Sequence, residues 1–311
     1  MLATASVLNT TRIGQAASLP ERTLQAPART TLLEGVRQRN ALLDALFYDV
    51  GVVGREEAAR ISPWLAAEGA ILIVPPTGGG QLTLCSSVDD FHAAGGDAIR
   101  TIAVAGVGSS ALGSAAFARN VADATAEKVA AVVSGYGLAD IATEALGGFF
   151  WFGALNSLRH HFEVLDRLTE PDNAAERSLR SKSTSSPTRE SRDTRTVLAL
   201  LNDQRFKLDL LVGHSKGNLV LSEALYALKS MDGERLEALA KTTRIVTVSA
   251  RVAMPRPLED VVDVMGAWDW FGGLNSRPDI KPDYVVPAAW HHTNTELPAH
   301  LPVTATLKKV I

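Results

Sequence analysis

The residues best suited to do chemistry in this sequence form the pentapeptide Gly213-His214-Ser215-Lys216-Gly217. The mostly apolar residues 208–212 precede it, and residues 218–229 have the apolar spacing of a helix. A Gly-x-Ser-x-Gly turn between a strand and a helix holds the serine hydroxyl out in front of a sheet, where it can act as a nucleophile. The two glycines leave room for the strand and the helix to approach each other. We therefore expect Ser215 to be a nucleophile held in a strained turn.

The amide that follows the serine has a chemical role of its own. The backbone N–H of Lys216 lies at the N-terminus of the expected helix, where the helix dipole favours negative charge. Such charge develops on a carbonyl oxygen under nucleophilic attack, and an N–H aimed at that oxygen stabilises the transition state. We therefore expect Lys216 to supply one donor of an oxyanion hole.

This strand, turn and helix resemble the nucleophile elbow of the α/β-hydrolase family, and in particular that of its small lipases and esterases. The third strand of such proteins commonly ends in a His-Gly-x-Gly-Ser-Ser turn, and residues 105–110 match it with alanine in place of the histidine. The resemblance implies that the backbone N–H of Val107 is the second oxyanion donor. Residues 135–137 match a Gly-x-Gly turn of the family, whereas Asn218 replaces the small residue most common after the elbow.

A serine hydroxyl is a poor nucleophile until an imidazole takes its proton, and the imidazole needs a carboxylate to fix its tautomer. The family order is serine, acid, histidine, and only His291, His292 and His300 follow the serine. The first two come directly after apolar residues 284–288, where the family places its base. We favour His291, because a His-x-x-x-x-Glu-x-Pro spacing that is frequent in similar hydrolases begins there. His292 is the alternative base.

The candidate acid is Asp269. Residues 264–269, Val-Met-Gly-Ala-Trp-Asp, resemble the strand-Gly-x-x-Asp turn that carries the carboxylate in the family. Asp260 and Asp263 fall at the start or in the middle of the same strand, which is the wrong edge for a site at the carboxyl ends of the strands. We expect His214 to pack or to form hydrogen bonds at the elbow and to transfer no proton.

Strands and helices alternate along much of the chain, which favours an α/β fold with a mostly parallel sheet covered by helices on both faces. We expect about eight strands, with bounds uncertain by a few residues. The sequence resemblance refines this expectation to the α/β-hydrolase fold. The expected strands are 71–74, 81–85, 99–105, 129–133, 208–212, 243–249, 261–266 and 284–288, and the clearest helices are 111–124 and 218–229.

The stretch between the strands ending near residue 133 and starting near residue 208 is too long for one crossover helix. We therefore expect a cap inserted at about 138–195 within a hydrolase domain of residues 70–311. The aromatic run Phe149-Phe150-Trp151-Phe152 lies in its first half. We expect Trp151 and Phe152 to contact the substrate, and packing of this run against the sheet domain is an equal alternative. Residues 176–195, rich in Ser, Thr and Arg, are expected to form a mobile loop.

Residues 1–69 are expected to form a leader and a helical extension, with helices near 32–50 and 55–68.

Composition limits the choice of partners and compartment. The net charge is −3, so no overall basic surface for nucleic acid is evident. A single cysteine, Cys85, is typical of a reducing compartment, and the first residues lack the pattern of a secretory signal, so we expect a cytoplasmic protein. The longest uncharged apolar run, 145–155, is too short to span a membrane, although peripheral contact with lipid stays possible. His160-His161 lacks the spacing of a metal site, and we expect neither metal nor cofactor.

These residues predict a serine hydrolase that cleaves a small-molecule or lipid ester through a Ser-His-Asp triad and an acyl-enzyme. One alternative is a non-catalytic binding protein with the same fold. A second is a dinucleotide-binding protein that uses Gly106, Gly108 and Gly113 as its glycine fingerprint. Against it, the third glycine is displaced from its usual position, and the strand at 129–133 ends without an acidic residue for a ribose hydroxyl.

Overall fold

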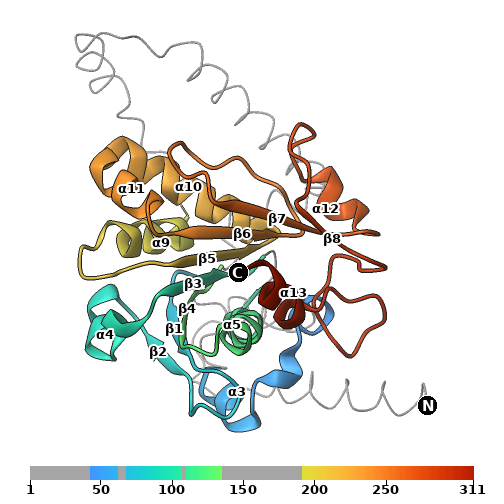
Figure 1. Cartoon of the computed structure of the whole chain (residues 1–311). Coiled ribbons are helices and arrows are strands. Elements are labelled where there is room, and N and C mark those ends of the chain that lie inside the picture. The colour runs from blue at the N-terminus through green and yellow to red at the C-terminus, as the bar shows by residue number, and fades with distance from the viewer. Residues whose placement is uncertain (1–42, 62–67, 107–108, 135–190) are drawn as a thin grey trace, which may run out of the picture.

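A twisted sheet runs through the middle of the molecule (Figure 1). The computed structural model describes residues 43–61, 68–106, 109–134 and 191–311. Within them the sheet has eight strands in the order β2-β1-β4-β3-β5-β6-β7-β8. All neighbours from β4 to β8 pair in parallel, whereas β1 pairs antiparallel with both β2 and β4. The strands are β1 (Ile71–Val74), β2 (Thr83–Cys85), β3 (Thr101–Val104), β4 (Val129–Val132), β5 (Leu210–His214), β6 (Arg244–Val248), β7 (Val261–Gly266) and β8 (Tyr284–Val286).

The central strands are short apolar runs because both faces of the sheet are covered. Side chains alternate between the faces of a strand, and in β1 they enter two separate cores. Leu72 and Val74 belong to one buried cluster, and Ile71 and Ile73 to the other. Such a strand cannot show the alternation of apolar and polar residues that marks a half-exposed sheet.

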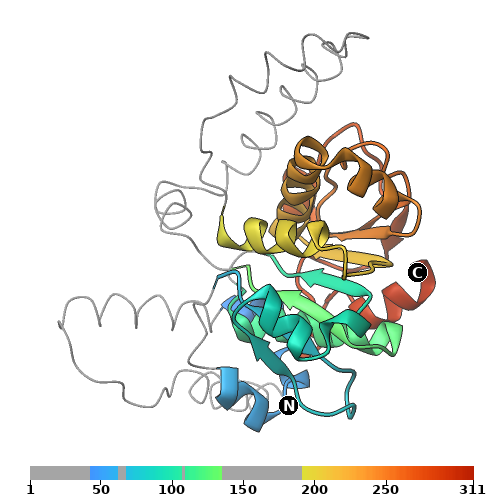
Figure 2. The same cartoon turned by 90° about the vertical axis from the view of Figure 1, so that its left-hand side faces the viewer.

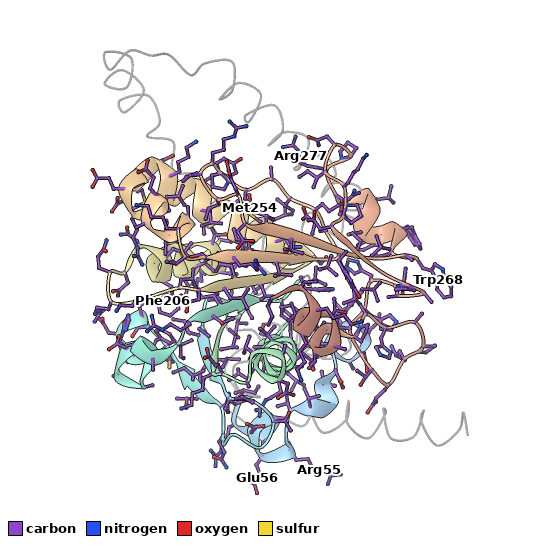
Figure 3. All side chains as sticks on the ribbon, viewed as in Figure 1. Arg55, Glu56, Phe206, Met254, Trp268 and Arg277 are labelled. Carbon is purple, nitrogen blue, oxygen red and sulfur yellow. The ribbon has the colours of Figure 1, made fainter. Side chains whose placement is uncertain are left out.

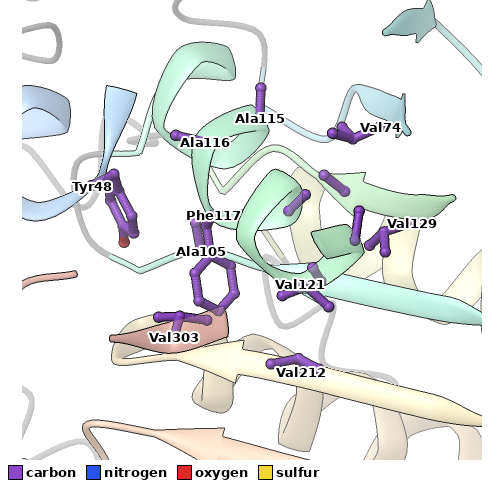
Figure 4. Packing of buried hydrophobic residues seen from close by; sticks show 14 of the residues in the cluster. Tyr48, Val74, Ala105, Ala115, Ala116, Phe117, Val121, Val129, Val212 and Val303 are labelled. Atoms are coloured by element: carbon purple, nitrogen blue, oxygen red, sulfur yellow. The ribbon is translucent and has the colours of Figure 1, made fainter. Parts of the chain in front are cut away.

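Each core is closed by its own set of helices, which lie on opposite sides of the sheet (Figures 1 and 2). Figure 4 shows the tight packing on the first side, where Phe117 lies among alanine and valine side chains. The helices on that side are α3 (Arg55–Ile61), α5 (Ala111–Thr125) and α13 (Val303–Val310). Those on the other side are α4 (Val88–Ala93), α9 (Arg192–Asn202), α10 (Lys216–Met231) and α11 (Gly233–Ala240). The short elements are η1 (Val50–Val52), η3 (Gly96–Ala98) and α12 (Trp270–Leu274).

The expected α/β class, with a mostly parallel sheet of eight strands and helices on both faces, is confirmed. The expected loop at 176–195 is wrong at its end, because residues 192–195 form the first turn of α9. That turn is Arg-Asp-Thr-Arg, which has the composition of a loop, but the apolar face that follows it packs against α10. The helix expected over 55–68 is α3, which ends at Ile61, and residues 62–67 lie outside the described part.

Residues just before the sheet in the sequence are part of its core. Helical residues 43–47 and the segment that follows place Tyr48 and Val53 in the same buried cluster as α5. Among the described residues, no helix combines the length and the apolarity that a membrane span requires.

Asp44, fully buried, caps the N-terminus of α5. Its carboxylate accepts hydrogen bonds from the backbone N–H of Ser110, at 3.0 Å, and from the Ser110 hydroxyl. A side chain at Gly113 would overlap this carboxylate, so glycine is required there. Burial raises the pKa of Asp44 to about 7, although hydrogen bonds from Ser110 and Gly113 act in the opposite direction.

The raised pKa of Asp44 predicts how stability depends on pH. The folded protein keeps this carboxyl protonated to a higher pH than the unfolded chain does, so its contribution to stability is full below about pH 4 and is lost as the pH rises through about 7. Asp44→Asn removes that contribution. We expect the unfolding free energy of the wild type, relative to the variant, to decrease between pH 4.5 and pH 8 in urea titrations. A difference that stays constant over this range would show that Asp44 is ionised throughout.

Candidate active site

Ser215 lies at a sharp turn between β5 and α10. Its backbone angles are φ 52° and ψ −120°, a combination that residues with a side chain rarely adopt and that costs about 1–3 kcal/mol. The Ser215 N–H donates to the carbonyl of Val248 at 2.8 Å, which ties the strained residue to the end of β6. The surrounding sheet therefore imposes the conformation that the sequence motif predicted.

The glycines on both sides of Ser215 are required by close approaches. A β-carbon at Gly213 would overlap the side chain of Asn218, and one at Gly217 would overlap the backbone carbonyl of Val104 in β3. Asn218, the departure from the family pattern, has a structural role. Its side-chain N–H₂ donates to the carbonyls of Val248, at 3.0 Å, and Ala250, at 2.9 Å, and so ties the first turn of α10 to the chain after β6.

The structure brings Ser215, His291 and Asp269 together in one hydrogen-bonded chain. His291 Nε2 lies 3.0 Å from Ser215 Oγ, and His291 Nδ1 lies 2.9 and 3.0 Å from the two carboxylate oxygens of Asp269. The three residues follow β5, β7 and β8, so each stands at the carboxyl end of a strand in the parallel part of the sheet. All three are buried: Ser215 is 7% exposed, His291 2% and Asp269 4%.

The protonation of this chain follows from its partners. Burial acts to raise the pKa of Asp269, but hydrogen bonding and charge from His291, and the N–H of Gly272 at 2.6 Å, outweigh it and lower the pKa. Because an ionised carboxylate only accepts, the hydrogen lies on His291 Nδ1. In the neutral ring Nε2 is then left to accept from the Ser215 hydroxyl, which is the arrangement that a general base needs.

Aromatic rings confine the imidazole of His291. Phe271, on α12, packs edge-on against it with ring centroids 4.7 Å apart, and Phe47 does the same at 5.9 Å. The ring of His214 lies 5.2 Å away. These contacts restrict rotation of the imidazole, so its two nitrogens stay aligned with Ser215 and Asp269.

The alternative candidates for base and acid contact other groups. His292 Nε2 lies 3.1 Å from the carbonyl of Pro298, and burial lowers the pKa of His292. Asp263 accepts a hydrogen bond from the Thr247 hydroxyl, and Asp260 pairs with an arginine side chain. The geometry therefore selects His291 and Asp269 from the candidates that the sequence left open.

Part of the expected oxyanion hole can be placed. The backbone N–H of Lys216 is the first amide of α10 and directly follows Ser215. Gly106, at the end of β3, packs so closely that a β-carbon there would lie 2.8 Å from the Cβ of Ser215. Val107 comes next in the chain and lies outside the described residues, as do Trp151 and Phe152.

Two tryptophans flank Asp269 on the surface. Trp268 and Trp270 are 61% and 64% exposed, although the aspartate between them is buried. Figure 3 shows Trp268 at the outer edge of the molecule, away from the helices of both cores. The turn that carries the acid thus presents apolar surface to its surroundings.

Phe47 and Tyr48, which precede the sheet, also contribute to this site, and the sequence did not predict this. Phe47 and Tyr48 fall within the helix expected near 32–50, and no motif marked either residue. His214 was expected to form hydrogen bonds at the elbow, and its ring does so with Tyr48 and with the His291 carbonyl. Only the fold brings these residues together, because Tyr48 and His214 are 166 positions apart.

The glycine fingerprint considered for a dinucleotide is already occupied by side chains of the protein. Pyrophosphate would bind at the N-terminus of the helix that follows the fingerprint. In this structure Asp44 takes that position at the start of α5, and Gly106 packs against the nucleophile. Among the described residues, no group of three or more His, Cys, Asp and Glu side chains is arranged to hold a metal ion.

Comparisons of the chain with protein-family models, with curated proteins and with solved structures found no match. The geometry of the site is therefore the main evidence for a function.

The close approach at Gly217 predicts a large loss of stability on substitution. Gly217→Ala would press a methyl group onto the backbone carbonyl of Val104, and such overpacking costs about 1–3 kcal/mol. Gly233, in the first turn of α11, has open space around it and serves as the matched control. We expect Gly233→Ala to gain up to about 1 kcal/mol, because alanine favours a helix over glycine. Urea titration gives the unfolding free energy of both variants. Equal effects of the two substitutions would contradict the close approach of Gly217 to Val104.

Proposed function

We propose that this protein is a serine hydrolase of the α/β-hydrolase type that cleaves carboxylic esters through an acyl-enzyme. The observation that carries the proposal is the continuous chain from Ser215 Oγ through the His291 ring to the Asp269 carboxylate. A strained serine, a neutral imidazole acceptor and a buried carboxylate at the same sheet edge are what acyl transfer needs. The proposed fold type is supported by the mostly parallel eight-stranded sheet with the serine between β5 and α10.

The first half of the reaction forms the acyl-enzyme. Ser215 Oγ attacks the ester carbonyl carbon while its proton moves to His291 Nε2, and Asp269 stabilises the imidazolium that results. Negative charge on the former carbonyl oxygen is stabilised by the N–H of Lys216 and, as the family resemblance implies, by that of Val107. The bond to the alcohol oxygen then breaks, and the alcohol leaves with the proton from His291.

The second half repeats the same steps with water. His291 removes a proton from a water molecule, whose oxygen attacks the acyl carbon of the acyl-enzyme. The bond to Ser215 Oγ breaks, the serine regains its proton from His291, and the carboxylic acid is released. Each proton passes through a single imidazole, which explains why the triad needs no metal or cofactor to complete the cycle.

An activated nucleophile is tested by Ser215→Ala. We expect the variant to lose labelling by a fluorophosphonate probe and at least about a thousandfold of the hydrolysis rate of a short p-nitrophenyl ester. Ser222→Ala is the matched control, because Ser222 is a buried serine in α10, the helix that follows Ser215, and its hydroxyl donates to the Ala253 carbonyl at 2.8 Å. Labelling of Ser215→Ala at the wild-type rate would exclude Ser215 as the nucleophile. A wild-type protein that takes up no probe would favour the alternative, a non-catalytic binding protein.

The choice between the two adjacent histidines is tested by a pair of substitutions. His291→Ala removes the hydrogen-bond acceptor of Ser215, so we expect ester hydrolysis to fall by at least about a thousandfold. His292→Ala removes a buried imidazole of the same size that contacts Pro298, so we expect a much smaller loss of kcat. Circular dichroism checks that both variants fold. A larger loss in a folded His292→Ala protein would transfer the role of base to His292.

A further inference from the structure

The hydroxyl of Tyr48 contacts both the loop after β3 and the last residue of β5. Tyr48 is 1% exposed, and its Oη lies 2.6 Å from the backbone N of Gly106 and 3.2 Å from Nδ1 of His214. A backbone N–H can only donate, so Oη accepts from Gly106. The Tyr48 O–H is then directed to His214 Nδ1.

The ring of His214 continues this chain to the base. His214 Nε2 lies 2.9 Å from the backbone carbonyl oxygen of His291. Because a carbonyl only accepts, Nε2 carries the hydrogen, and Nδ1 of the neutral ring accepts from Tyr48. Burial lowers the pKa of His214 to about 3, and the neighbouring His291 acts in the same direction, so the ring is neutral. Every hydrogen along this path therefore has one defined position.

The segment that carries Tyr48 also holds the loop after His291. The carbonyl of Phe47 accepts from the N–H of Thr293 at 2.7 Å and from its hydroxyl at 3.0 Å. The carbonyl of Ala45 accepts from the Asn294 side chain at 2.6 Å. At its other end the same segment binds Ser110 through Asp44, as described above. Residues 44–48 therefore contact both the loop after β3 and the loop that carries the base.

We propose that Tyr48 and His214 are positioning residues, which hold the Gly106 loop and the backbone of His291 in the alignment that acyl transfer at Ser215 requires. The proposal rests on the hydrolase function proposed above. Neither side chain touches the reacting atoms. They act because a displacement of about 1 Å at a catalytic group can lower a rate by about a hundredfold. At one end of this hydrogen-bonded chain Gly106 packs against Ser215. At the other end the backbone of His291 sets the position of the imidazole ring that contacts Ser215 Oγ.

The first test is Tyr48→Phe, which removes the shared hydroxyl and keeps the ring. We expect kcat for a p-nitrophenyl ester to fall between about tenfold and a hundredfold, with KM changed less than about twofold, because the alignment of reacting groups is lost and not the binding of substrate. Tyr284→Phe is the matched control. It removes a hydroxyl that accepts from Lys309 at 3.3 Å on the outside of the protein, and we expect it to leave kcat unchanged.

A merely structural role is separated by counting active sites. The fluorophosphonate probe, added to completion, titrates the folded sites that carry a reactive Ser215, and kcat is expressed per titrated site. A positioning role lowers kcat per site. If Tyr48→Phe only lowers the fraction of molecules that are folded, kcat per titrated site stays at the wild-type value, and the proposal is overturned.

His214→Leu provides an independent variant. A leucine fills part of the buried space but can neither donate to the His291 carbonyl nor accept from Tyr48, so we expect a lower kcat with KM retained. Because both residues act through one chain, the double variant should lose no more than the worse single variant. Losses that multiply, or a His214→Leu protein with wild-type kcat per site, would overturn the proposal. Failure of the hydrolase function itself is recognised separately, since Ser215 would then take up no probe in the wild type.

Discussion

The geometry of the site depends on the backbone of a single residue, Ser215. At φ 52° and ψ −120° its conformation is unfavourable in isolation, so it persists only where the surroundings determine it. Its N–H is held by Val248, and glycines on both sides allow β5, α10 and the end of β3 to meet. Asn218 adds two hydrogen bonds from α10 to the chain after β6. The strain is thus balanced by packing and hydrogen bonds contributed by three neighbouring elements.

Local motifs predicted the parts of the site that depend on local backbone. The elbow around Ser215 needs glycine at fixed offsets, and Asp269 follows a strand and caps α12, so both leave a pattern in the sequence. The choice between His291 and His292 required the structure, because adjacent residues share every sequence context. Tyr48 could not be found from the sequence, since an apolar helix position looks the same whether its ring fills a core or its hydroxyl joins two loops.

The errors in the fold had a similar origin. The start of α9 was assigned to a loop because its first turn is polar, yet Asp193 and Thr194 are buried there. Helix starts are often polar, since side chains must satisfy amides that have no partner within the helix. The expected cap, the Val107 donor and the contacts of Trp151 and Phe152 lie outside the described residues and stay predictions.

Three buried histidines lie close together in this site, yet their surroundings give them different roles. His214 uses both of its nitrogens, one toward Tyr48 and one toward a carbonyl, so it has no free acceptor for a proton. His292 has one nitrogen near the Pro298 carbonyl, and no carboxylate in the described part of the chain pairs with its ring. His291 alone of the three faces an ionised carboxylate on one side and a serine hydroxyl on the other. The carboxylate therefore decides which imidazole can stabilise a positive charge.

This arrangement bears on where the functional unit begins. The sequence placed a boundary near residue 70, where the sheet starts, and treated earlier residues as an extension. Yet Asp44 caps α5, Tyr48 supports Gly106 and His214, and the Phe47 carbonyl holds Thr293. A chain that began at β1 would keep Ser215, Asp269 and His291 but would leave the Gly106 amide, the start of α5 and the loop after His291 without these partners. Buried polar groups that lose their partners destabilise the fold around them. The segment before the sheet is therefore as much a part of the scaffold of the candidate site as the strands that precede Ser215, Asp269 and His291.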